Sequence, residues 1–106
     1  MRPRVIIESP FAGDVKRNGI YLKRCMIDSM ACGEAPYASH ALYTQFLDDT
    51  NPDERATGMH CGQAWYVGAD LMVAYIDYGI STGMVEGIKY CKLLNIPTVS
   101  RTIGIN

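Results

Sequence analysis

Continuous apolar runs alternate along this chain with longer segments in which apolar residues recur at helical spacing. Two runs, at residues 5–7 and 70–76, are typical of strands that are buried in a parallel sheet. A shorter run at 35–38 contains Pro36, which cannot donate a ladder hydrogen bond and therefore favours an edge strand. Residues 97–102 complete the set of four predicted strands.

Helix start signals lie between these strands. A capping side chain precedes each of three helical segments, and the second segment also has proline at its first position. We therefore predict helices over residues 15–31 after Asp14, from Asn51 to about Val67, and from Ser81 through Leu94. The apolar residues of segment 39–51 recur with no clear period, so this segment forms either a short helix or a loop over the sheet.

The predicted order of elements is βαβαβαβ, which is typical of a parallel sheet covered by helices on both faces. We expect one domain over residues 1–106, a small doubly wound (flavodoxin-like) α/β three-layer sandwich with four strands in the order 2-1-3-4. Ligands in such folds bind beyond the carboxyl ends of the strands, where the strand order reverses. The predicted crevice therefore lies between the first and third strands.

The candidate ligand-binding residues follow from this crevice. Two helix N-termini, near Asp14 and Ser81, would open onto it, and their free N–H groups favour an anion such as phosphate. Aromatic side chains could stack on a base. The candidates are Ser9, Pro10, Phe11, Gly13, His40, Tyr43, Asp77, Tyr78, Gly79, Ser81, Gly83 and Met84. For Gly79 and Gly83 an alternative stays open, because turn and packing roles explain these glycines equally well.

Four acidic residues are candidate reacting groups: Glu8, Asp70, Asp77 and Glu86. Asp70 stands at the entry end of its strand, far from the crevice if the strand begins there. Two carboxylates crowded at one edge of a sheet could divide the roles of nucleophile and acid. Asp77 is the best placed of them, whereas a glutamate at position 86 also complements the helix dipole. If the protein is an enzyme, Glu86 and Asp77 are the expected catalytic residues. We expect no Ser–His–Asp set, because His40 and His60 lie outside the two crevice loops.

Composition and charge limit the classes of binding partner and the cellular compartment that we expect for this protein. Ten basic and eleven acidic residues give a net charge of −1, which offers no electrostatic footprint for duplex nucleic acid or an anionic membrane. No apolar run approaches a membrane span of about 20 residues or a signal peptide, so we expect a cytoplasmic protein. Four cysteines without a C-x-x-C pair predict free thiols, and we expect neither a metal site nor a cofactor.

Small and large residues share one face of the second predicted helix, where Gly58 and Gly62 lie near Trp65. A domain of this size seldom leaves a tryptophan exposed, so this face either packs on the sheet or contacts another subunit. We favour the subunit contact and expect a homo-oligomer that forms through this helix.

Three stretches of the chain resemble an uncharacterised family of small phage and bacterial proteins. They read RPRVIIESPF at residues 2–11, EAPYASH followed by YTQ at 34–45, and GISTGMVEGI at 79–88. That family in turn resembles the nucleoside 2-deoxyribosyltransferases and the deoxynucleotide N-hydrolases. The first resemblance covers nearly the whole chain, whereas the second rests on the first strand and residues 69–87. It implies the same fold and a pocket for a nucleotide-like ligand.

The resemblance also implies a chemistry. Those enzymes attack the anomeric carbon of a nucleoside with a glutamate near the start of their third helix. Counting without a gap from Asp70 places Glu86 at that position, while counting from Ser81 or back from Asn95 places Gly87 there. Glycine can perform no nucleophilic step.

Two functions follow from the resemblance. The first is a binding protein that holds a nucleobase–ribose–phosphate ligand without cleaving it. This would suit a phage protein that sequesters a host nucleotide immune signal, an ADP-ribose derivative or a cyclic dinucleotide, in the host cytoplasm. The second is an N-glycosidase or 2-deoxyribosyltransferase acting on (deoxy)nucleosides or nucleotides, with Glu86 as nucleophile. Binding is favoured because two of the three counts select Gly87, and a purely structural role leaves the crevice unexplained.

Overall fold

A parallel four-stranded sheet forms the centre of the computed structural model, which describes residues 1–105. The strands are β1 (Arg4–Glu8), β2 (Ala35–Tyr37), β3 (Leu71–Tyr75) and β4 (Thr98–Arg101). Their order is β2-β1-β3-β4, and every neighbouring pair is parallel. The predicted fold class and strand order are confirmed, and the strand ends differ from the predicted ends by one residue.

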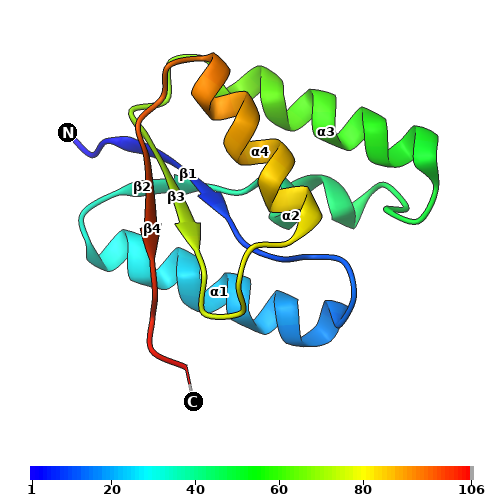
Figure 1. Cartoon of the computed structure of the whole chain (residues 1–106), viewed down its shortest axis with the longest axis horizontal. Helices are drawn as coiled ribbons and strands as arrows, with labels where there is room; N and C mark the ends of the chain where they lie inside the picture. Colours follow the sequence, from blue (N-terminus) through cyan, green and yellow to red (C-terminus); the bar gives the residue numbers. More distant parts are fainter. Residues whose placement is uncertain (106) are drawn as a thin grey trace.

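The helices lie where their start signals predicted. They are α1 (Val15–Ala31), α3 (Pro52–Tyr66) and α4 (Thr82–Leu93). The side chains of Asp14, Asn51 and Ser81 accept hydrogen bonds from first-turn amides, so all three expected caps form. The segment without a clear period contains α2 (Ser39–Leu42) and one 3₁₀ turn, η1 (Tyr43–Gln45). Helix α1 covers one face of the sheet, and α3 and α4 cover the other (Figure 1).

Alternation along the strands builds one core on each face of the sheet. The core against α1 contains Val5, Ile7, Tyr21, Leu22, Cys25, Ala38, Val73 and Tyr75. The core against α3 and α4 contains Ile6, Tyr66, Met72, Ala74, Met84, Cys91 and Ile96. Because both faces of β1 and β3 are buried, these strands have continuous apolar sequences and not alternating ones.

The cysteines are free, as predicted. Cys25 and Cys91 are buried, Cys61 is partly buried and Cys32 is exposed. Over residues 1–105, no helix combines the length and the apolar character that crossing a membrane requires.

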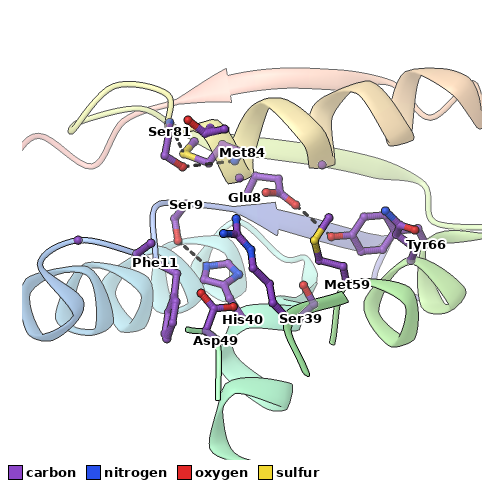
Figure 2. A pocket seen from close by; sticks show the side chains of 17 residues that line it. Glu8, Ser9, Phe11, Ser39, His40, Asp49, Met59, Tyr66, Ser81 and Met84 are labelled. Atoms are coloured by element: carbon purple, nitrogen blue, oxygen red, sulfur yellow. Dashed lines mark hydrogen bonds between the residues drawn. The ribbon is translucent and has the colours of Figure 1, made fainter. Parts of the chain in front are cut away.

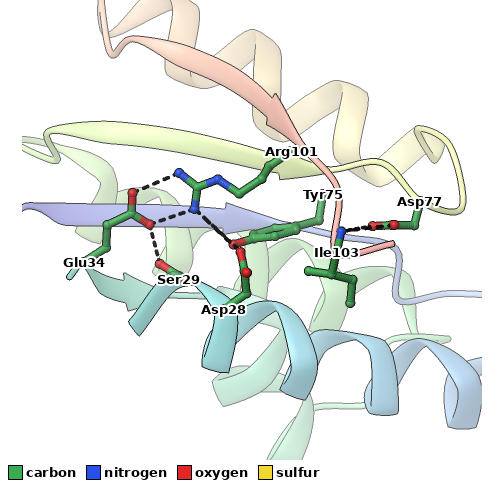
Figure 3. Close-up of polar contacts among 7 residues, drawn as sticks. All are labelled: Asp28, Ser29, Glu34, Tyr75, Asp77, Arg101 and Ile103. Atoms are coloured by element: carbon green, nitrogen blue, oxygen red, sulfur yellow. Dashed lines mark hydrogen bonds and ion pairs between the residues drawn. The ribbon is translucent and has the colours of Figure 1, made fainter. Parts of the chain in front are cut away.

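A polar network ties the edge strand β4 to the segment that precedes the opposite edge strand β2 (Figure 3). Arg101 binds Glu34 through both ends of its guanidinium, with N–O distances of 3.0 Å, and Ser29 donates to Glu34 Oε1 at 2.7 Å. Arg101 also donates to the hydroxyl of Tyr75, which in turn donates to Asp28. The Arg101 hydrogen bonds lower the pKa of Glu34, although burial opposes them. Bidentate pairing of this kind is directional and strong.

We expect Arg101→Met to lower the free energy of unfolding by about 3 kcal/mol, because it leaves the Glu34 carboxylate buried without its partner. Urea unfolding would measure the loss. Arg24→Met is the matched control, since Arg24 is an exposed arginine of α1 whose side chain makes no hydrogen bond within residues 1–105. Equal stabilities for the two variants would contradict a stabilising role for the network.

Candidate functional site

A cavity of about 590 Å³ opens at the carboxyl end of β1. Its walls come from the end of β1 and the following loop, from α2, from one face of α3 and from the first turns of α4 (Figure 2). This volume lies within the usual range for small-molecule sites, about 300–1,000 Å³. The cavity therefore has room for a ligand of nucleotide size at the end of the sheet where doubly wound folds bind ligands.

The carboxyl group of Glu8 forms part of the cavity wall, at the last position of β1. The residue is 7 % exposed, and Tyr66 donates its phenolic proton to Glu8 Oε2 at 3.0 Å. Burial raises the pKa of Glu8 to about 7, although the Tyr66 hydrogen bond opposes the change. Burial and the Glu8 charge also raise the pKa of Tyr66, which therefore stays a donor. A carboxyl that titrates near neutral pH inside a cavity is a signature of a functional site.

Gly87 makes the space that the Glu8 carboxyl occupies. A Cβ placed on Gly87 would lie 2.5 Å from Glu8 Cδ, which is closer than any real side-chain contact. Every residue other than glycine at this position of α4 would therefore displace the carboxyl. The Glu8 carboxylate of β1 thus occupies the space in which a side chain at position 87 of α4 would otherwise lie.

The first turn of α4 forms the second polar part of the cavity. Ser81, Thr82 and Gly83 line it, and the Ser81 hydroxyl accepts from the Met84 amide at 3.3 Å. No hydrogen bond among residues 1–105 uses the N–H groups of Thr82 or Gly83. Arg55 of α3 also lines the cavity, and its Nη2 would lie 3.9 Å from a Cβ on Gly83. Free amides and a guanidinium beside a helix N-terminus favour an anion.

A neutral histidine pairs with serine on the opposite wall. Ser9 Oγ and His40 Nε2 are hydrogen-bonded at 2.8 Å. Burial lowers the pKa of His40 to about 4, so the ring is uncharged near neutral pH. Within residues 1–105 no carboxylate binds the ring of His40, so the pair lacks the third member of a catalytic triad. Phe11 packs edge-on against His40, with ring centroids 6.5 Å apart.

Seven of the predicted ligand-binding residues line the cavity: Ser9, Phe11, Gly13, His40, Ser81, Gly83 and Met84. His40 reaches it from α2, although the sequence placed it outside the crevice loops. The structure does not bring Pro10, Tyr43, Asp77, Tyr78 or Gly79 into the lining. Tyr43 instead lines a neighbouring recess of about 90 Å³ beside α3.

Asp77 has a structural role and does not line the cavity. Its carboxylate accepts a hydrogen bond from the amide of Ile103 (Figure 3). It also accepts hydrogen bonds from the amide of Gly104 and from the Tyr21 hydroxyl. Burial alone would raise the pKa of Asp77, but these hydrogen bonds lower it. Tyr78 lies under the guanidinium of Arg17, 3.9 Å from the ring centroid. The loop after β3 thus holds the C-terminal segment and packs against α1.

Glu86 is exposed and does not line the cavity, whereas its neighbour Gly87 does. Its place on the outer side of α4 follows from helical geometry, because residues one apart point about 100° from each other. The structure therefore does not support Glu86 as a nucleophile. The carboxylates that line the cavity are those of Glu8 and Asp49.

One face of α3 was missed as a source of site residues. Arg55, Met59, Gln63 and Tyr66 all line the cavity. Their spacing of four, four and three residues places them on one side of a helix, and this spacing is the feature of the sequence that could have identified them.

The glycines of α3 contact other parts of the chain: a Cβ on Gly62 would lie 2.5 Å from Ser39 Cβ, and one on Gly58 would lie 3.4 Å from Leu47. Trp65 is 67 % exposed, so only the tryptophan remains as a basis for the predicted subunit contact.

Within residues 1–105, no group of three or more histidine, cysteine, aspartate or glutamate side chains is arranged to hold a metal ion.

Comparisons with known proteins bear on the family and the fold. The model of one protein family, described as a domain of unknown function (DUF7768), matches residues 3–101. No curated protein sequence matches the chain significantly. Among solved structures, the chain is similar to a "2-desoxiribosyltransferase from Leishmania mexicana", with a TM-score of 0.62 and 10 % identity. The match covers 96 % of this chain and 65 % of that one. The chain thus has a deoxyribosyltransferase-like fold and spans about two thirds of that protein's length.

We expect the buried Glu8 carboxyl to make the protein less stable as the pH rises. Between about pH 4.5 and 7 the folded protein keeps this proton, whereas the unfolded chain releases it, so stability falls with pH across this window. The difference corresponds to about 3 kcal/mol at pH 8. Glu8→Gln removes this dependence, so its stability relative to the wild type should rise by about that amount between pH 4 and pH 8.

Urea unfolding at several pH values would measure this relative stability. Glu86→Gln removes an exposed carboxylate from α4 and is the matched control, which should follow the wild type at every pH. A stability difference between Glu8→Gln and the wild type that stays constant from pH 4 to pH 8 would contradict the raised pKa.

Proposed function

The chain belongs to the DUF7768 family, and we propose that it binds a nucleotide-like ligand of nucleobase, ribose and phosphate in the cavity at the end of β1. The observation that carries this proposal is the convergence of three chemically different walls on one cavity. The first turn of α4 and Arg55 favour an anion, the region around Glu8 and Tyr66 offers polar groups, and Phe11 and Met59 offer apolar surface. A phosphate, a sugar and a base need these three environments.

The phosphate is assigned to the first turn of α4. The unused N–H groups of Thr82 and Gly83 would donate to phosphate oxygens, and the helix dipole favours their negative charge. Arg55 can add charge-assisted hydrogen bonds, since no ion pair within residues 1–105 engages it. Glu8 would repel a phosphate, which supports placing the phosphate away from Gly87.

We further propose that the ligand is held intact. A phage-encoded protein of this kind would sequester a host nucleotide immune signal, such as an ADP-ribose derivative or a cyclic dinucleotide. The sequence resemblance to phage proteins supports this, as does glycine at position 87 on the cavity wall, because glycine supplies no nucleophile. Homo-oligomer formation through α3 stays part of the proposal, now resting on the exposed Trp65.

We expect the purified protein to retain a nucleotide from a mixture of nucleoside monophosphates, ADP-ribose and cyclic dinucleotides. Gel filtration, denaturation and mass spectrometry would identify the compound that is carried. Ser81→Arg should abolish retention, because a larger side chain at the start of α4 fills the anion end of the cavity.

Val85→Arg is the matched control, since it adds the same guanidinium to α4 at an exposed position that does not line the cavity. It should retain the ligand. Full retention by Ser81→Arg, with folding confirmed by circular dichroism, would refute binding in this cavity.

A second candidate function is cleavage of the N-glycosidic bond. The observation that favours it is the Glu8 carboxyl, which titrates near neutral pH at the cavity wall and could replace Glu86 as the reacting group. Cleavage would release the base, and water or a second base would take its place at the anomeric carbon.

For this second candidate we expect free base to accumulate when the protein is incubated with nucleosides or nucleotides, measured by liquid chromatography. Glu8→Gln should stop the release, while Glu86→Gln should leave it unchanged. Quantitative recovery of intact ligand from the wild-type protein would exclude cleavage of the compounds tested and favour the binding protein.

A further inference from the structure

The two oxygens of the Glu8 carboxyl have different surroundings. Oε2 accepts the Tyr66 hydrogen bond at 3.0 Å, whereas no donor within residues 1–105 is hydrogen-bonded to Oε1. Neither ion pair of the described residues involves Glu8, although Arg55 lines the same cavity. Oε1 keeps some accessible surface, since among the described residues the Tyr37 hydroxyl is the single fully buried side-chain polar atom without a partner. Water or a ligand can therefore donate to Oε1. The cavity is the direction from which a donor can come.

The place of Glu8 relative to α4 indicates which part of a nucleotide it meets. Gly83 and Gly87 both line the cavity and lie four residues apart, about 6 Å along the helix axis. The Glu8 carboxyl lies against Gly87, and the free amides lie at the start of the helix. With the phosphate at those amides, the next group along the nucleotide is its sugar. The sugar hydroxyls are therefore the donors that can reach Oε1.

The neighbouring groups favour neutral donors. Ser39 and Tyr66 add hydroxyl groups to the same part of the cavity wall, and His40 is uncharged near neutral pH. A carboxylate at the end of a strand in an α/β fold can accept hydrogen bonds from ribose hydroxyls, as in dinucleotide-binding domains. A methylene at the 2′ position of the sugar would leave Oε1 with one donor fewer.

We infer that Glu8 is the residue that selects the sugar: its free carboxylate oxygen accepts hydrogen bonds from the vicinal hydroxyls of a ribose. The site therefore prefers ribonucleotides to 2′-deoxyribonucleotides. This inference rests on the proposed nucleotide-binding function. Loss of a hydrogen bond to a charged group reduces affinity by about tenfold or more.

The test compares adenosine, guanosine, cytidine and uridine 5′-monophosphates with their 2′-deoxy counterparts by isothermal titration calorimetry. For any base that binds, we expect the ribonucleotide to bind about tenfold more tightly or better. Glu8→Met, which keeps the length of the side chain but removes the acceptor, should bring the two affinities within about twofold. Glu86→Gln should keep the wild-type ratio.

A second measurement needs no variant. The ionised carboxylate is the stronger acceptor, so the ratio of ribonucleotide to deoxyribonucleotide affinity in the wild type should increase as the pH rises from about 6 to 8, following the Glu8 pKa of about 7. Because the ratio compares ligands with the same phosphate, the titration of the phosphate cancels.

The outcomes separate the inference from the proposed function. Binding of both sugar types with equal affinity at every pH overturns sugar selection and leaves nucleotide binding in place. Sugar selection is also overturned if affinity depends only on whether the base carries an amino group, because that group and not the sugar would then be the donor to Glu8. Absence of binding for all eight nucleotides, with ADP-ribose and cyclic dinucleotides also failing to bind, overturns both.

Discussion

The cavity depends on the parallel pairing of β1 with β3. In this register Glu8 pairs with Ala74, so the two strands end at the same level. The loop after β1 and the start of α4 consequently meet at one edge of the sheet, which is the position where the strand order reverses. Helices α3 and α4 cover the same face of the sheet (Figure 1). The side of α3 from Arg55 to Tyr66 closes the cavity at this edge. Without parallel pairing, these groups would lie at opposite ends of the sheet.

Much of the fold could be predicted because its determinants are local. Three capping side chains mark the helix starts, and the continuous apolar runs of β1 and β3 reflect burial on both faces. The site was less predictable, since its contacts are long-range. Asp77 follows β3 as expected, yet its carboxylate binds amides 26 and 27 residues further along the chain. No local pattern indicates that the C-terminal segment lies there.

One side of α3 carried a signal in the sequence that the prediction did not use. This side carries Arg55, Met59, Gln63 and Tyr66. The small residues Gly58 and Gly62 of the same helix were instead interpreted as part of a subunit contact. Glu8 was a candidate from the sequence, and its place two residues after Ile6 puts it by strand alternation on the face covered by α4. What the sequence could not reveal is that Gly87 leaves room for a carboxyl on that face. This match between a strand side chain and a helix glycine exists only after folding.

The surroundings of Glu8 also explain why holding a ligand is favoured over cleaving it. A nucleophilic carboxylate needs an oxygen that is free to approach the anomeric carbon. Here Tyr66 occupies one oxygen, and a ribose hydroxyl would occupy the other, so both would accept hydrogen bonds in the bound state. Burial further favours the protonated form, which is not nucleophilic. The contacts that suit Glu8 to recognise a sugar therefore weaken it as a nucleophile. Burying the ionised carboxylate lowers the free energy of unfolding, and this loss is consistent with a role of Glu8 in recognition.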